Sequence, residues 1–95
     1  MAREYNVAIM GATGAVGKEL LSIVEERKFP VKNLKLLASE RSVGKEMVYQ
    51  GRKLKVELLD SNSFRGVDIV LASAGASISK QFRKDMADAK ALCID

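Results

Sequence analysis

Three glycines stand at three-residue spacing near the start of the chain, in the run Gly11-Ala12-Thr13-Gly14-Ala15-Val16-Gly17. The run follows a short apolar segment, residues 7–10, and precedes a segment with helical periodicity. A strand, a glycine turn and a helix in this order direct backbone N–H groups and the positive end of a helix dipole at one place. The run therefore predicts a binding site for the pyrophosphate of a nucleotide cofactor. The alternative is an ordinary turn between a strand and a helix, because glycines also occur in loops.

Each glycine of this turn has its own expected role. Gly11 lets the chain leave the strand through a tight turn, where a positive φ would exclude most side chains. Gly14 leaves space for phosphate oxygens against the backbone, and Gly17 allows the helix to pack closely. Thr13 stands where the strict G-x-G-x-x-G pattern has its middle glycine, and it adds a hydroxyl group. Gly11, Thr13 and Gly14 are thus the first candidate cofactor-binding residues.

A second group of candidates follows the second apolar segment. Dinucleotide enzymes that use NAD usually place a carboxylate at the end of the second strand, where it accepts a hydrogen bond from the ribose 2′-hydroxyl. Here that position is Ser39, and Arg41 and Ser42 follow it. A guanidinium binds phosphate through two parallel hydrogen bonds, so this group favours NADP over NAD. Two alternatives stay open: Arg41 is a solvated surface charge, or Glu40 faces the 2′-phosphate and repels it.

The periodicity of the apolar residues predicts an α/β fold, a Rossmann-type βαβ nucleotide-binding half with a mostly parallel sheet. We expect a helix over residues 15–28 whose apolar stripe is Val16, Leu20, Ile23 and Val24, ended by Phe29-Pro30. Short strands at 47–49 and 54–58 flank Gln50–Lys53 and predict a hairpin inserted at a sheet edge. The remaining expected elements are strands at 34–39, 67–72 and 91–94, a turn at 60–63, and a helix over 79–90 that buries Phe82, Met86 and Ala89.

A second turn of small residues, Ser73-Ala74-Gly75-Ala76-Ser77, also lies between a strand and a helix. The carboxyl ends of parallel strands meet at one edge of a sheet. We therefore expect the turns at 11–17, 39–42 and 73–77 to line a single crevice, although they are far apart in the sequence.

Length and composition limit the classes of protein to consider. Ninety-five residues, 47% hydrophobic and 29% charged, suit one globular domain but not a cofactor domain together with a substrate domain. No apolar run approaches the roughly 18 residues of a spanning helix, and the first residues lead into no signal-peptide core. We therefore expect a cytoplasmic protein with no membrane partner.

Charge and residue usage argue against several other functions. The formal charge is +4, but acidic and basic residues are interspersed, and the aromatic fraction is only 5%. Without a stacking platform we expect no nucleic-acid partner. The single cysteine excludes an internal disulfide, and the absence of histidine argues against a metal site. Cys93, between Leu92 and Ile94, is expected to be a buried core residue, so we predict no catalytic residue in this chain.

Four runs together resemble the bacterial-type aspartate-semialdehyde dehydrogenases, in the amino-terminal part of their NADP-binding domain. These runs are residues 11–17, 25–31 and 37–45, and residues 66–70 leading into Ser73-Ala74-Gly75, and the resemblance covers almost the whole chain. The run Leu37-Ala38-Ser39-Glu40-Arg41-Ser42-Val43-Gly44-Lys45 is the most distinctive of them.

The resemblance implies the reduction of β-aspartyl phosphate to aspartate semialdehyde by NADPH. The family releases phosphate, passes through a cysteine thioester, and acts as homodimers on the route to lysine, threonine and methionine. By resemblance, Thr13, Gly14, Ala15 and Val16 bind the dinucleotide, and Ser39, Arg41 and Ser42 hold the 2′-phosphate. Ser73, Ala74 and Gly75 are implied to approach the nicotinamide side of the cofactor.

The family's catalytic cysteine, histidine and arginines are implied to lie beyond Asp95. Residues 1–95 would then be the amino-terminal segment of an NAD(P)-binding Rossmann domain, without the catalytic and dimerisation domain, and would bind cofactor without catalysing the reaction. The alternatives are an N-acetyl-glutamyl-phosphate reductase, a short-chain-type reductase, or a stand-alone nucleotide-binding or regulatory module. The Leu37–Lys45 run argues against the two reductases.

Overall fold

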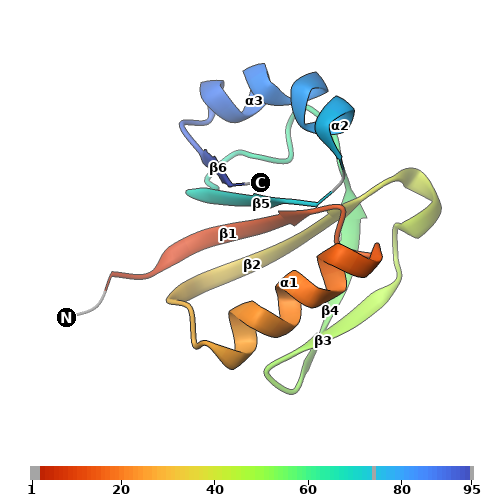
Figure 1. Cartoon of the computed structure of the whole chain (residues 1–95), viewed down its shortest axis with the longest axis vertical. Helices are drawn as coiled ribbons and strands as arrows, with labels where there is room; N and C mark the ends of the chain where they lie inside the picture. The colour runs from red at the N-terminus through yellow and green to blue at the C-terminus, as the bar shows by residue number, and fades with distance from the viewer. Residues whose placement is uncertain (1–2, 74, 95) are drawn as a thin grey trace.

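The computed structural model describes residues 3–73 and 75–94. A single twisted sheet runs through the molecule, with helices on both of its faces (Figure 1). The strands are β1 (Tyr5–Met10), β2 (Val31–Ala38), β3 (Glu46–Tyr49), β4 (Arg52–Leu58), β5 (Ile69–Ala72) and β6 (Leu92–Ile94). The helices are α1 (Ala15–Glu26), α2 (Ala76–Gln81) and α3 (Arg83–Asp88), and a 3-10 turn, η1, spans Glu40–Ser42.

The order of the strands is β3-β4-β2-β1-β5-β6, and every neighbouring pair except β3 and β4 is parallel. The antiparallel β3–β4 hairpin forms one edge of the sheet. Its turn consists of Gln50 and Gly51, whose φ angles are 50° and 75°. After β1 the chain moves outward through β2 to the edge strand β3, comes back with β4 between β3 and β2, and then crosses to the other side of β1 with β5. The α/β fold with a mostly parallel sheet and an edge hairpin is confirmed, and the strand order reverses at the β1–β5 junction, where such folds bind their ligands.

Two apolar clusters, one on each face of the sheet, hold the layers together. Successive residues of a strand point to opposite faces, and β1 supplies Ile9 to one cluster and Ala8 and Met10 to the other. The helix α1 covers the Ile9 face and packs Leu21 and Val24 there. The helices α2 and α3 cover the opposite face, where Met86, Phe82 and Ala89 pack against the sheet as expected.

The predicted apolar stripe of the first helix is right at Leu20 and Val24, which pack against the sheet, and wrong at its other two positions. Val16 and Ile23 are exposed, whereas Gly17, Leu21 and Val24 are the buried residues of α1. The reason is Gly17: a Cβ at this position would lie 2.2 Å from the carbonyl oxygen of Gly11. This contact between the helix and the glycine turn sets the rotation of α1, so the face containing residues 17, 21 and 24 meets the sheet. The helix also ends at Glu26, two residues earlier than expected.

The predicted helix over residues 79–90 is two short helices, α2 and α3, separated at Phe82. Phe82 has φ −101° and ψ 7°, and its ring lies 6.0 Å from that of Phe64, centroid to centroid. Phe64 is fully buried under this layer. The helical hydrogen bonds continue through this point, from the Phe82 N–H to the Ile78 carbonyl at 3.2 Å and from the Met86 N–H to the Phe82 carbonyl at 3.0 Å, so the break is a local kink at Phe82.

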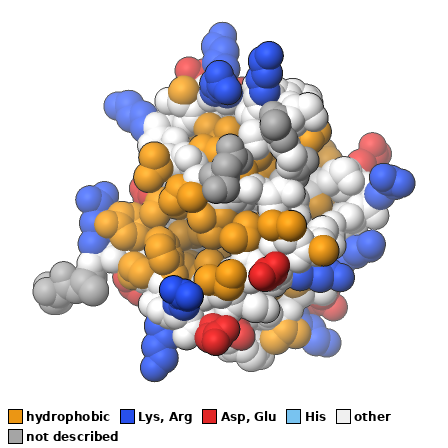
Figure 2. Space-filling view, in the orientation of Figure 1, with side chains coloured by type: hydrophobic (Ala, Val, Ile, Leu, Met, Phe, Trp, Pro, Cys, Tyr) orange, Lys and Arg blue, Asp and Glu red, His pale blue; other side chains and the backbone are white. Residues whose placement is uncertain are grey.

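The expected burial of Cys93 is also wrong. All three residues of β6 are exposed, with Leu92 at 62% and Ile94 at 45%, because β6 is the last strand of the sheet and pairs with β5 alone. Leu92 and Ile94 lie beside Ile69 and Leu71 of β5, which are only partly buried. Figure 2 shows hydrophobic side chains in a band over the strands between α1 and the other two helices, with Lys and Arg around the rim.

Candidate functional site

The glycine turn after β1 is fixed to the end of β2 by the backbone. Gly11 has φ 87°, as the tight-turn prediction requires, and the N–H groups of Gly11 and Ala12 both donate to the Leu37 carbonyl, at 2.8 and 3.0 Å. Gly14 is the N-cap residue of α1, with no side-chain cap and no acidic residue in the first helical turn. The first N–H groups of a helix have no partner within the helix. The positive end of α1 is therefore open to an anionic group.

The three glycines differ in what a side chain would meet. At Gly17 a Cβ would collide with the backbone of Gly11 and Ala12, which confirms its predicted role in close packing. At Gly14 the nearest heavy atom to a Cβ would be the Gly11 oxygen at 3.6 Å, an ordinary contact, and φ is −74°. The fold of the chain itself therefore does not require glycine at position 14, and the role of Gly14 toward a ligand stays a prediction.

The three turns at the carboxyl edge of the sheet meet, as predicted. A cavity of about 420 Å³ lies between them, and its lining includes Gly11, Thr13 and Gly14 from the first turn, Ser39 from the second and Ser73 from the third. The Ser73 hydroxyl donates to the carbonyl oxygens of Met10 and Gly11, at 2.9 and 3.1 Å. The first and third turns are thereby joined directly across the β1–β5 junction.

Other predicted site residues lie outside this lining. Ala15 and Val16 are exposed in the first turn of α1, and Gly75 is the exposed N-cap of α2 with φ 96°. Arg41 is exposed on η1, whereas Ser42 beside it is buried and shares a hydrogen bond with Thr13. Ala74 falls outside the described residues.

An apolar wall of the cavity was not predicted from the sequence. It consists of Leu59, Ile78 and Phe82, and Ala38 and Gln81 complete the lining. Ile78 and Phe82 lie on the helical segment that follows the second small-residue turn. Their place in the sequence, as the apolar residues nearest that turn, could have predicted that they line the cavity. Leu59 carries no such signal, because its place depends on the bond from its N–H to the Ala38 carbonyl, at 2.9 Å, which brings the end of β4 beside β2.

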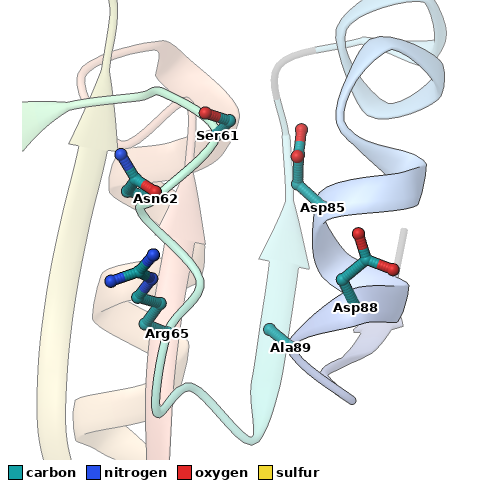
Figure 3. Close-up of a pocket in the computed structure, with 6 residues that line it drawn as sticks. All are labelled: Ser61, Asn62, Arg65, Asp85, Asp88 and Ala89. Atoms are coloured by element: carbon teal, nitrogen blue, oxygen red, sulfur yellow. The ribbon is translucent and has the colours of Figure 1, made fainter.

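A second hollow, of about 290 Å³, lies between the 61–66 turn and α3 (Figure 3). Its lining holds Asp85, Asp88 and Ala89 on one side and Ser61, Asn62 and Arg65 on the other. Figure 3 shows Asp85 and Asp88 on the α3 side of this hollow, opposite Asn62 and Arg65. They would repel a phosphate, so the cavity at the carboxyl edge is the better place for a nucleotide.

Within residues 3–73 and 75–94, no three His, Cys, Asp or Glu side chains gather closely enough to hold a metal ion. In the same part of the chain, no helix is both long and apolar enough to cross a membrane.

Comparison with known proteins identifies the family. Residues 6–95 match the model of the semialdehyde dehydrogenase NAD-binding domain. The chain belongs to this family. The aspartate-semialdehyde dehydrogenase of Synechocystis is 50% identical over 95 residues, which is all of this chain and 28% of the relative. The chain thus spans little more than a quarter of the length of the curated relatives it matches.

Solved structures agree with the family and the fold. Aspartate semialdehyde dehydrogenase II of Vibrio cholerae, in a complex with ASA, superposes with a TM-score of 0.92 at 43% identity, covering 98% of this chain and 31% of that one. The aspartate semialdehyde dehydrogenase of Candida albicans, solved with NADP, has a TM-score of 0.75 at 19% identity and covers 96% of this chain and 29% of its own. The second likeness shows the fold alone.

Proposed function

We propose that this chain is the NADP-binding part of an aspartate-semialdehyde dehydrogenase. The observation that carries the proposal is the cavity at the carboxyl edge, where the uncapped start of α1 and the side-chain-free Gly14 adjoin an apolar wall. The pyrophosphate would lie at the start of α1, close to Thr13, Gly14, Ala15 and Val16. Leu59, Ile78 and Phe82 offer a surface for a flat ring of the dinucleotide, because cofactor sites are mostly apolar with a few polar groups that fix orientation.

The choice of NADP over NAD is part of this proposal. Ser39 lines the cavity and Arg41 lies two residues further on η1, exposed and able to turn toward a bound 2′-phosphate. The turn that contains Ser73 and Gly75 would face the nicotinamide end of the bound cofactor. When bound, NADPH supplies the hydride of the reaction, and the role of this chain is to bind and orient it.

The full enzyme that we propose reduces β-aspartyl phosphate to aspartate semialdehyde and phosphate. By the resemblance described above it is a cytoplasmic homodimer serving lysine, threonine and methionine synthesis. Its catalytic cysteine and histidine would come from other parts of that enzyme, since this chain contains no histidine. A general base and an activated thiolate are the usual pair in such chemistry.

Calorimetric titration of the 95-residue chain with NADPH, NADH and 2′,5′-ADP tests the binding proposal. We expect NADPH and 2′,5′-ADP to bind more tightly than NADH. Equal affinities for NADPH and NADH would contradict NADP selectivity, and no binding of any of the three would contradict the nucleotide site.

A separate assay tests whether this chain binds the cofactor without catalysing the reaction. The purified chain should form no NADPH from aspartate semialdehyde, phosphate and NADP. Phosphate-dependent NADPH formation by this chain alone would show that it carries catalytic groups.

A further inference from the structure

In the part of the chain that the structure describes, no helix covers one face of the strands β5 and β6 (Figure 1). Four apolar side chains lie together on this face: Ile69 and Leu71 of β5, and Leu92 and Ile94 of β6. Leu71 pairs with Ile9 of β1, so the four belong to the face that α1 covers farther along the sheet. We call these four residues the β5–β6 surface.

The flank of α1 beside this surface is also apolar. Val16, Leu20 and Ile23 follow one another at helical spacing and form a stripe, which we call the α1 stripe. Val16 is 56% exposed and Ile23 is 40% exposed. On the other flank of α1, Glu25 contacts Gln50 in the turn of the hairpin, which lies at the opposite edge of the sheet from β6. The α1 stripe therefore faces toward β5 and β6.

The β5–β6 surface and the α1 stripe together have the size and shape to hold one more helix. Neighbouring strands lie about 4.8 Å apart, so two strands are about as wide as one helix, whose diameter with side chains is about 10–12 Å. Leu20 and Leu71 both pack at the margin of the same buried cluster. A helix in this place would therefore extend the existing core.

The handedness of the fold limits which helix can lie there. Connections between parallel strands are right-handed in nearly all proteins. The connection from β1 to β2 places α1 on one face of the sheet. The connection from β5 to β6 runs toward the opposite edge and places α2 and α3 on the other face. A further parallel strand beside β6 would likewise need its connecting helix on the α2–α3 face, so the next βαβ unit of a longer chain leaves the β5–β6 surface open.

A second copy of this chain is a poor occupant of the surface. Outside the α1 stripe, the exposed sides of the described helices are mainly polar or charged, as at Glu19 and Glu26 of α1 and Lys84 of α3. A copy would therefore bring no apolar helix face to the surface. By contrast, this chain spans only 28% and 27% of two curated relatives, so most of the enzyme that we propose lies outside these 95 residues.

We propose that an amphipathic helix from a distant part of the same enzyme packs on the β5–β6 surface, alongside α1. It would come from more than about 30 residues beyond Asp95, because a βαβ unit takes about that length and the next unit is directed to the other face. It would also hold the free flank of α1, the helix whose first turn forms the proposed pyrophosphate site. The inference rests on the proposed function only in taking this chain as part of a longer enzyme.

A photo-crosslinking experiment identifies what lies against the α1 stripe. The matching residues of the Synechocystis enzyme are replaced by this chain, and p-benzoylphenylalanine is introduced in place of Ile23 in this chimaera. The control carries it in place of Ser22, which is exposed and about 100° around α1 from Ile23. Gel electrophoresis separates products within one chain from products between two chains, and mass spectrometry identifies the joined peptide. We expect the reporter at position 23, and not the control, to join a peptide of the same chain more than about 30 residues beyond Asp95.

A pair of charge substitutions measures whether the surface is covered. Leu92 and Val48 are 62% and 61% exposed, and they lie on the strands at opposite edges of the sheet. In the isolated chain, Leu92→Glu and Val48→Glu should each change the melting temperature by less than about 3 °C, as exposed substitutions do. In the chimaera, Leu92→Glu should lower it by about 5 °C or more, because a carboxylate buried without a partner is costly, and by more than Val48→Glu does.

Three other results would overturn the inference. A product that joins two chains at position 23 would mean that a second copy occupies the surface. A product within one chain that joins the first 30 or so residues after Asp95 would mean that the next connection covers it. No product at position 23, together with equally small effects of the two substitutions in the chimaera, would mean that the surface stays open to solvent.

The test remains decisive if the chimaera does not fold. The same reporters and substitutions are then placed at the aligned positions of the intact Synechocystis enzyme, where the same results are expected. Neither measurement depends on the cofactor. A chain that fails to bind NADPH therefore overturns the proposed function alone, and a failed cross-link in a chimaera that binds NADPH overturns this inference alone.

Discussion

Arg41 is the residue on which cofactor choice depends most directly. It lies exposed on η1, two residues after the Ser39 that lines the cavity. We expect Arg41→Ala to weaken NADPH binding by about 1.5–3 kcal/mol, the usual range for hydrogen bonds to a charged group, and to leave NADH almost unchanged. Calorimetry with both cofactors checks this. Equal losses for NADPH and NADH would mean that Arg41 contacts a part that both cofactors share. Added salt should also reduce the preference of the parent chain for NADPH over NADH, because an exposed charge pair is screened.

Glu40 provides the opposite case on the same turn. If its carboxylate faces the bound 2′-phosphate, Glu40→Ala removes a repulsion and strengthens NADPH binding, while NADH binding stays the same. The ratio of the two affinities, measured in the same titrations, is the quantity to follow. An unchanged ratio would mean that Glu40 points into solvent in the complex.

Gly14 and Gly17 form a matched pair within one turn. A Cβ at position 17 would lie 2.2 Å from a backbone oxygen, whereas at position 14 the nearest atom is at 3.6 Å. We expect Gly17→Ala to destabilise the fold by about 1–3 kcal/mol, the usual cost of overpacking. Gly14→Ala should cost less than about 1 kcal/mol of stability, because alanine is a poorer N-cap than glycine, and should lose cofactor affinity. Urea unfolding and NADPH titration of both variants test this, and full NADPH affinity in Gly14→Ala would show that the turn is only structural.

At the scale of elements, the hairpin is attached to α1 through a carboxylate. The Glu25 side chain accepts a hydrogen bond from the Gln50 N–H, in the turn between β3 and β4. Tyr49, the last residue of β3, is buried beside it. Burial raises the pKa of the Tyr49 hydroxyl above 10.0, the Glu25 carboxylate raises it further, and Arg52 lowers it.

Because the pKa of Tyr49 is raised in the folded chain, the stability of the fold should fall at alkaline pH. A group whose pKa is higher in the folded chain stabilises the fold below its unfolded pKa, and this contribution is lost as pH rises through the folded pKa. We therefore expect the chain to lose stability above about pH 10, and Tyr49→Phe to lose less over the same range. Unfolding measured at a series of pH values checks this. In an NMR titration, Glu25→Gln should move the pKa of Tyr49 downward, and an unchanged pKa would mean that burial alone is responsible.

At the scale of the whole molecule, the middle of the sheet and its β6 edge differ in how much they contribute to stability. Leu37 of β2 is fully buried in the middle of the sheet, whereas Leu92 of β6 is 62% exposed at its edge. Leu37→Ala should cost about 2–5 kcal/mol through lost burial and the cavity it leaves. Leu92→Ala, the matched change on an exposed strand, should stay within about 0.5 kcal/mol. Urea unfolding compares the two, and equal losses would mean that Leu92 is covered in solution.

The sequence by itself determined the features that depend on local spacing. The glycine run predicted a positive φ at Gly11 and close packing at Gly17, and alternating apolar segments predicted the parallel sheet, the edge hairpin and the meeting of three turns. These succeed because backbone sterics and side-chain periodicity act over a few residues, and because parallel strands must bring their carboxyl ends together.

Only the tertiary structure decided how the elements meet one another. The rotation of α1 follows from the contact between Gly17 and the Gly11 carbonyl, and the break between α2 and α3 lies at Phe82, whose ring packs against that of Phe64. Cys93 has an apolar neighbour on each side in the sequence, yet it is exposed because β6 is an edge strand. Ser42 turns inward to Thr13, across 29 residues. Such contacts depend on pairs distant in the chain, which periodicity does not encode, and they decide which side chains reach the cavity.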